Sequence, residues 1–199
     1  MRLGKREQWS AGKDKSIKIN MRGRFMMDDI RKAGAEDASR LAEILIFAKR
    51  THYRSIFHDD KVSFGKMQVY PLARDYIVNR EKLNHIWVYD DEFVKGMLHI
   101  EGRELRELYV DPFFQGEGIG TRLIEFAIRQ FEVQYLFVLE KNSSAIHFYQ
   151  SHGFSRTQER RLEEGTAEYV VKMERRRGIS ADTRRGGEAD HGQSHAVSS

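Results

Sequence analysis

The chain of 199 residues has room for one folded domain with tails, and 40% hydrophobic and 11% aromatic residues suffice for one core. It contains no cysteine, which excludes a disulfide framework, thiolate chemistry and a zinc–thiolate site. No apolar run approaches the ~20 residues of a membrane span, and the N-terminus lacks the apolar segment of a signal peptide. We therefore expect a cytoplasmic protein without a membrane partner.

The net charge of +4 is concentrated at the two ends of the chain. Residues 1–26 hold eight Lys/Arg against two Asp/Glu, and residues 175–199 hold five against three, which leaves the body at −4. Because neither end has the apolar content to pack, we predict a disordered basic arm over 1–27, one domain over 28–174 and a disordered tail over 175–199. No nucleic-acid motif accompanies the basic residues, so nucleic acid is not the expected partner.

The body shows helical and extended patterns in alternation. In chain order, the expected elements are a short strand at 28–34, a helix over 36–48, a helix from Pro71 to 78, a hairpin at 85–102, a strand at 103–110, a helix over 119–131, a buried strand at 135–139, a helix from Asn142 or Ser143 to Gly153, and two strands at 154–160 and 167–173. This order predicts an α/β (α+β) domain with a mixed, mainly antiparallel twisted sheet and helices on its faces.

A glycine-rich stretch, "QGEGIGTR", lies between the strand ending at Val110 and the helix beginning at Ile119. It is not a P-loop, because Gly120 is followed by threonine and arginine rather than by lysine and serine or threonine. It is not a dinucleotide fingerprint either, because threonine stands where the third glycine is needed. Glycines at a helix start let an anion reach the unpaired N–H groups there, although an ordinary glycine-rich turn has the same local sequence.

A second stretch, "NSSAIHFYQSHGF", follows the buried strand, and with the first it resembles the GNAT superfamily of acetyl-CoA-dependent N-acetyltransferases. The matching residues are Leu108-Tyr109-Val110, Gln115 to Gly120, Asn142, Ala145, Phe148-Tyr149 and Gly153-Phe154. The resemblance implies a splayed strand pair that binds acyl-CoA, a glycine loop that holds the pyrophosphate, and acetyl-CoA as co-substrate without a metal. The residues that it places at the coenzyme are Leu108, Val110, Gln115, Gly116, Gly118, Ile119, Gly120, Thr121 and Asn142.

The resemblance also implies direct transfer of the acetyl group to a primary amine. Tyr149 lies where many family members have the tyrosine that protonates the leaving thiolate, and a buried aromatic is its plain alternative. Glu104 lies where several members have a catalytic glutamate. An even separation puts it on the same side of the strand as Val110, whereas Glu107 lies on the other face. A solvated strand carboxylate, or water in place of a single base, stays open.

Two other functions stay open, a non-catalytic acyl-CoA-binding regulatory module and a nucleic-acid-binding protein with basic tails. The eight histidines show no metal-ligand spacing supported by nearby carboxylates, so we expect no metal site. Residues 47–75, which include Asp59 and Asp60, and the final strand pair are where the fold would hold the acceptor. Neither the acceptor's identity nor the oligomeric state, with a homodimer among the options, follows from the sequence.

Overall fold

The computed structural model describes residues 29–57, 61–164 and 166–176. The predicted arm over 1–27, nearly all of the predicted tail and the pair Asp59–Asp60 lie outside these residues. The helices and strands, in chain order, are β1 (Ile30–Lys32), α1 (Ala38–Phe57), α2 (Val69–Val78), β2 (Ile86–Asp91), β3 (Phe93–Glu101), β4 (Glu104–Val110), α3 (Ile119–Phe131), β5 (Tyr135–Leu139), α4 (Ser143–Ser151), β6 (Phe154–Leu162) and β7 (Tyr169–Arg175).

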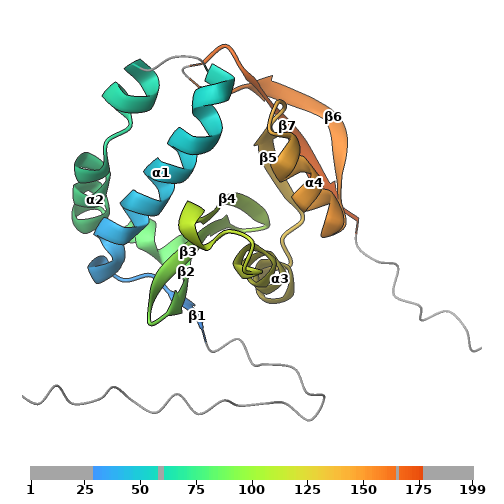
Figure 1. The fold of residues 1–199 in the computed structure, drawn as a ribbon. Coiled ribbons are helices and arrows are strands. Elements are labelled where there is room, and N and C mark those ends of the chain that lie inside the picture. The colour runs from blue at the N-terminus through green and yellow to red at the C-terminus, as the bar shows by residue number, and fades with distance from the viewer. Residues whose placement is uncertain (1–28, 58–60, 165, 177–199) are drawn as a thin grey trace, which may run out of the picture.

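The described strands form one seven-stranded sheet in the order β1-β2-β3-β4-β5-β7-β6. All neighbours are antiparallel except β4 and β5, which are parallel. This mixed, mainly antiparallel sheet confirms the fold class expected from the sequence. In Figure 1, α1 and α2 lie side by side at the left, and α4 lies against the β5–β7–β6 end of the sheet at the right.

Two apolar clusters divide the helices between the two faces of the sheet. Side chains of α3 and α4 pack with Leu98, Leu105 and Leu136. Side chains of α1 and α2 pack with Val88 and Met97. Because neighbours along a strand, such as Met97 and Leu98, point to opposite faces, the two helix pairs cover opposite faces of the same sheet.

Element types were predicted correctly, but several boundaries move. The helix predicted over 36–48 continues as α1 to Phe57, because Ile56 is buried against Leu139 and Val170 of the sheet. The helix expected from Pro71 begins two residues earlier, at Val69, and keeps the proline in its first turn. A π-helical turn at Lys61–Lys66 and 3₁₀ turns at Ala35–Asp37, Arg80–His85 and Pro112–Phe114 were not predicted. β7 runs to Arg175, one residue beyond the predicted domain end.

Candidate active site

The sheet opens between its two parallel strands. β4 and β5 are paired only at Glu104–Tyr135 and Leu105–Leu136, although β4 continues to Val110 and β5 to Leu139. The strands are thus neighbours at their starts and separate toward their carboxyl ends, as the sequence predicts for residues 104–110 and 135–139. This opening, the β4–β5 gap, is the centre of the candidate site.

Main-chain groups of β4 face the β4–β5 gap. The N–H of Asp111 donates to the Lys95 carbonyl at 2.9 Å, which makes these two residues a hydrogen-bonded pair of the β3–β4 ladder. In an antiparallel ladder such pairs alternate, so Val110, opposite Gly96, turns its N–H and C=O away from β3. The same holds for Leu108, opposite Leu98. The strand therefore presents peptide groups to the gap, where a ligand that carries amide groups could accept and donate hydrogen bonds.

A cavity of about 980 Å³ extends along this gap. Side chains of α1 and α2 line one part of it and side chains of α3 and α4 line another, so the cavity connects the two faces of the sheet. Every residue predicted at the coenzyme or in catalysis lines it: Glu104, Leu108, Val110, Gln115, Gly116, Gly118, Ile119, Gly120, Thr121, Asn142 and Tyr149. The structure thus brings together two sequence motifs and the first residue of β4.

The glycine loop leaves open space at the start of α3. Gly116 and Gly118 have φ angles of 85° and 81°, and a Cβ built on either would meet no heavy atom within 4 Å. The first helical hydrogen bond runs from the N–H of Arg122 to the carbonyl of Gly118, which as glycine supplies no capping side chain. The N–H groups of Ile119 to Thr121 precede that bond, and with the helix dipole they suit an anion.

A buried carboxylate fixes the start of this loop. Asp111, 3% exposed, accepts a hydrogen bond from the N–H of Phe113 at 2.9 Å and forms an ion pair with Arg40 of α1 at 2.6 Å. Gln115 donates from its side-chain amide to the Val110 carbonyl at 3.2 Å. The loop is therefore attached both to a helix on the opposite face and to the end of β4.

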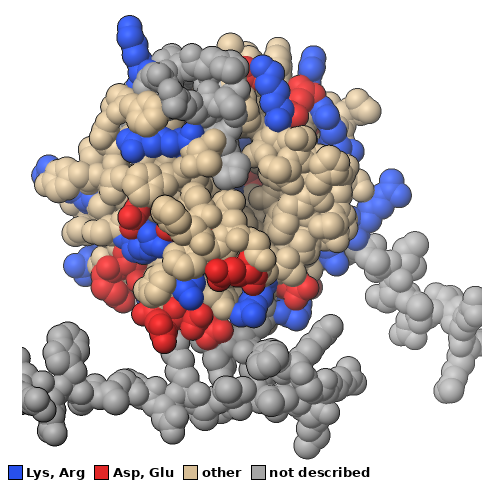
Figure 2. Space-filling view, viewed as in Figure 1, with Lys and Arg blue, Asp and Glu red and all other residues tan. Residues whose placement is uncertain are grey.

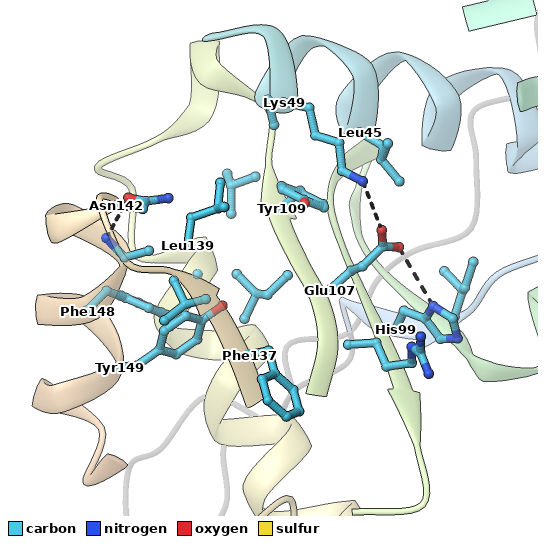
Figure 3. Close-up of a pocket in the computed structure, with 18 of the residues that line it drawn as sticks. Leu45, Lys49, His99, Glu107, Tyr109, Phe137, Leu139, Asn142, Phe148 and Tyr149 are labelled. Atoms are coloured by element: carbon cyan, nitrogen blue, oxygen red, sulfur yellow. Dashed lines mark hydrogen bonds and ion pairs between the residues drawn. The ribbon is translucent and has the colours of Figure 1, made fainter. Parts of the chain in front are cut away.

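Tyr149 and Asn142 come from α4 and its N-terminus. The Asn142 side chain accepts from the N–H of Ala145 at 3.1 Å, so it caps the helix as one of its two predicted roles. Tyr149 is half-buried, and its ring centroid lies 5.3 Å from Phe148 and 6.1 Å from Phe154. Figure 3 shows its hydroxyl directed away from the α4 axis, toward β5.

A β-bulge changes the argument for Glu104. Glu107 pairs with His99 while Leu105 pairs with Ile100, so Arg106 is an extra residue on β4. Leu105 and Val110, five positions apart, consequently pack into the same cluster. The even separation of Glu104 and Val110 therefore does not place them on the same side, and that inference from strand alternation was wrong. Glu104 still lines the cavity, with its side chain 17% exposed.

A second charged group lies at the α1–α2 side of the cavity, which we call the acceptor end. The Glu107 carboxylate lies 3.6 Å from Lys49 Nζ and 3.7 Å from His99 Nδ1, and these contacts are the dashed lines at the right of Figure 3. Burial alone would raise the pKa of Glu107, but His99 and Lys49 outweigh it and hold that pKa below its ordinary value. Burial, reinforced by the charge of Glu107, raises the pKa of Tyr76 well above its ordinary value.

Sequence reasoning missed this group, because its members come from four elements. Glu107 was assigned to the face away from the site on strand alternation, and nothing local links it to α1, α2 or β3. Tyr109, two residues further along β4 and so on the same side of the strand, packs with the α1–α2 cluster, and its ring centroid lies 6.0 Å from Lys49 Nζ. Among the described residues, no group of three or more Asp, Glu, His or Cys side chains has a metal-binding arrangement.

Charge on the visible surface is mixed. Figure 2 shows Lys, Arg, Asp and Glu side chains around the rim of one face and uncharged residues over most of its middle. Within the described part of the chain, no helix is long and apolar enough to cross a membrane.

Comparison with known proteins agrees with the resemblance that the two motifs carry. Residues 82–156 match the family model described as the acetyltransferase (GNAT) domain. The chain is 35% identical over 85 residues to the peptidyl-lysine N-acetyltransferase YiaC of Escherichia coli, a match that covers 42% of this chain and 57% of that protein. It is 27% identical over 134 residues to the peptidyl-lysine N-acetyltransferase YjaB of Salmonella typhimurium, a match that covers 66% of this chain and 86% of that protein.

Solved structures show the same fold at low sequence identity. The apo form of YjaB from Escherichia coli superposes with a TM-score of 0.57 at 22% identity, covering 73% of this chain and 95% of that one. A PaiA N-acetyltransferase from Thermoplasma acidophilum, solved in complex with coenzyme A, gives a TM-score of 0.53 at 20% identity. That match covers 73% of this chain and 97% of that one. Residues 82–156 thus match the acetyltransferase (GNAT) domain that the two motifs predict.

Proposed function

We propose that the protein transfers the acetyl group of acetyl-CoA directly to a primary amine, and that this amine is a lysine side chain of a peptide or protein. The cavity through the β4–β5 gap is the observation that carries this proposal. It joins a helix N-terminus suited to the coenzyme's phosphates on one face of the sheet to an acceptor end on the other. Two substrates can therefore approach each other from opposite faces without an intermediate on the enzyme.

The coenzyme would be held mainly by peptide groups. Its pyrophosphate would accept from the N–H groups of Ile119 to Thr121, and its pantetheine arm would follow the free edge of β4 at Leu108 and Val110. A PaiA acetyltransferase with this fold was solved with coenzyme A, which supports coenzyme A as the ligand. The residues present fit the group, because the loop provides open space at Gly116 and Gly118 where a side chain would obstruct the phosphates.

Transfer requires three proton and charge movements. The acceptor must lose a proton, because a lysine ammonium with a pKa near ~10.4 is not nucleophilic. The oxyanion formed on the thioester carbon needs a donor, and the N–H of Val110 is our candidate. The departing thiolate needs a proton, for which we propose Tyr149. Glu104, the catalytic glutamate that the resemblance implies, is one candidate for the base because it lines the cavity, and not because of strand alternation.

The acceptor class rests on the relatives' names. YiaC and YjaB are both named peptidyl-lysine N-acetyltransferases, but this chain spans only 57% of the length of YiaC in their match. The experiment is to incubate the full chain with acetyl-CoA and a lysine-containing peptide with a blocked N-terminus, and to follow both thiol release and peptide mass. Acetylation at the lysine is expected. Thiol release without modified peptide would contradict the proposal.

The alternative of a non-catalytic acyl-CoA sensor is distinguished by the same experiment, because it predicts binding without transfer. The presence of Tyr149 and of ionisable side chains at the acceptor end favours the enzyme. A nucleic-acid-binding role rested on the terminal basic residues, which lie outside the described part of the chain except at Arg175 and Arg176. A cytoplasmic location and a homodimer stay predictions.

A further inference from the structure

His99 of β3 lies between two carboxylates at the acceptor end. Its Nδ1 is 3.7 Å from the Glu107 carboxylate, and its Nε2 is 3.3 Å from the Glu101 carboxylate. All three side chains line the cavity. An imidazole with a carboxylate at each ring nitrogen can take up a proton at one nitrogen as it gives one up at the other, which is the geometry of a proton relay.

The three residues lead from the interior of the cavity to the surface. The side chains of His99 and Glu107 are 20% and 22% exposed, whereas Glu101, at the end of β3, is 45% exposed. Glu101 also contacts Arg106 at 2.8 Å. Glu107 directly precedes Leu108, whose N–H faces the β4–β5 gap. One end of the chain of groups therefore lines the cavity, and the other is in solvent.

The surroundings keep Glu107 anionic and disfavour a second cation there. Lys49 neutralises Glu107 from α1 and, being positive, would favour the uncharged form of an amine that enters beside it. Charged and titratable groups from every neighbouring element line this end of the cavity or face His99. They are Lys49 from α1, Asp75 and Tyr76 from α2, Lys82 and His85 from the Arg80–His85 turn, Glu101 from β3, and Glu104, Arg106 and Glu107 from β4.

We propose that His99 removes the proton from the acceptor's ammonium and passes it to the surface through Glu101. The inference rests on the proposed acetyl transfer. The ammonium gives one proton, across the Glu107 carboxylate, to Nδ1 of His99, while Nε2 releases one to Glu101 and then to water. The neutral amine attacks the thioester carbon, forming the C–N bond as the C–S bond breaks. The thiolate takes the hydroxyl proton of Tyr149. The nitrogen of the new amide then gives its second proton to the Tyr149 oxygen, which restores the hydroxyl.

His99 has an advantage over Glu104 in this role. Among the described residues, Glu104 forms an ion pair with Arg106 at 4.0 Å. His99 has a carboxylate on each side, one toward the cavity and one toward solvent. The two candidates therefore make different predictions for the same set of variants.

The test compares His99→Gln, Glu104→Gln and Glu101→Gln with wild type in single-turnover transfer to the blocked lysine peptide across pH. His99→Gln is expected to lower the rate at neutral pH by roughly 10²-fold, a contribution typical of proton transfer to a positioned group. Its deficit should shrink as pH rises toward ~10, because the acceptor then supplies its own free amine. A γ-thialysine peptide, whose amine loses its proton more readily, should reduce the deficit at neutral pH as well.

His147→Gln is the matched control, since His147 is an exposed histidine of α4 that does not line the cavity. Equal melting temperature and coenzyme affinity in wild type and His99→Gln would show that the fold is kept. If His99→Gln does not fold, His99→Asn takes its place in the same measurements.

Each outcome decides between the claims. A His99→Gln rate equal to wild type at every pH, with transfer intact, overturns the relay alone. The relay is also overturned if the pH-dependent loss of rate appears in Glu104→Gln and not in His99→Gln. It is overturned as well if the loss of rate in His99→Gln is the same at every pH and with the γ-thialysine peptide. If wild type binds acetyl-CoA but transfers nothing to either peptide, the proposed function fails and the relay with it.

Discussion

Arg40 on α1 and Asp111 at the end of β4 form an ion pair with an N–O distance of 2.6 Å, although 71 positions separate them. Asp111 is almost completely buried and also receives the N–H of Phe113, while Arg40 donates to the Val94 carbonyl at 2.9 Å. A helix on the acceptor face thus determines where the coenzyme loop begins. A substitution that breaks this ion pair should therefore affect the structure on both faces of the sheet.

Asp111→Ala should lower the free energy of unfolding by on the order of 3 kcal/mol, because it leaves a partly buried guanidinium without its buried partner. It should also weaken coenzyme A binding, since the turn before the glycine loop loses its cap. Urea unfolding and calorimetric titration measure the two effects. Glu43→Gln, which removes the more exposed partner of Arg40, is the control and should cost less than ~1 kcal/mol. Equal effects of the two substitutions would contradict this account.

Gly118→Ala should abolish coenzyme A binding by placing a side chain in the anion site. The left-handed φ of Gly118 also makes any side chain costly, by about 1–2 kcal/mol, so a loss of stability alone proves nothing. Gly102, in the turn between β3 and β4, has a φ of 58° and equally open space, and it lies outside the cavity lining.

Gly102→Ala is therefore the matched control for Gly118→Ala. Both variants should melt lower than wild type, and only Gly118→Ala should lose the rise in melting temperature that coenzyme A gives to the native protein. If both variants keep that rise, the phosphate site has been misplaced.

Tyr149→Phe keeps the ring packing against Phe148 and Phe154 and removes only the hydroxyl. We expect normal folding and coenzyme affinity, with the single-turnover rate of transfer lowered by roughly 10²–10⁴-fold. Single-turnover conditions are needed because slow product release would conceal the loss. Tyr169→Phe, a tyrosine of β7 outside the cavity lining, should match wild type. An undiminished rate in Tyr149→Phe would leave the thiolate to take its proton from water.

Asp37 should make stability depend on pH at the acid end. Burial alone would raise its pKa, but two hydrogen bonds from Arg31 and one from the N–H of Gly34 outweigh it and hold the pKa below the ordinary 3.8. Since the folded pKa is the lower one, the stabilisation is complete above about pH 4 and is lost as pH falls through the folded value.

Asp37→Asn should accordingly be less stable than wild type at neutral pH, and the difference should narrow in acid. Urea unfolding at a series of pH values tests this. Glu125→Gln, which alters an exposed carboxylate of α3, should change neither the stability nor its pH dependence. A difference between Asp37→Asn and wild type that persists unchanged into acid would contradict the assignment.

The fold, and the gathering of the residues proposed at the coenzyme around one cavity, could be predicted because their signals are local. The glycines, the proline after Val110 and the Asn142 cap each specify the backbone of their own turn, and the two motifs lie next to the strands that they follow. The elements came out in the right order for the same reason. The end of α1 was not predicted correctly, because its last turns are stabilised by contacts with β5 and β7.

The acceptor side could not be predicted, because it depends on contacts between distant segments. One extra residue at Arg106 inverts the alternation of β4, and no local pattern distinguishes such a bulge from a regular strand. Glu104 consequently lies on the same side of the strand as Glu107 rather than on that of Val110. Glu107 itself has Lys49 and His99 as neighbours that no spacing in the sequence links to it.

Backbone amide chemical shifts, recorded during titration with coenzyme A, test the central claim most directly. The account predicts that the largest changes fall on the amides of Leu108, Val110 and residues 118–121, with little change in β1 and β2. Changes concentrated on β1 or β2, or no change in any amide on addition of coenzyme A, would contradict the placement of the coenzyme in the β4–β5 gap.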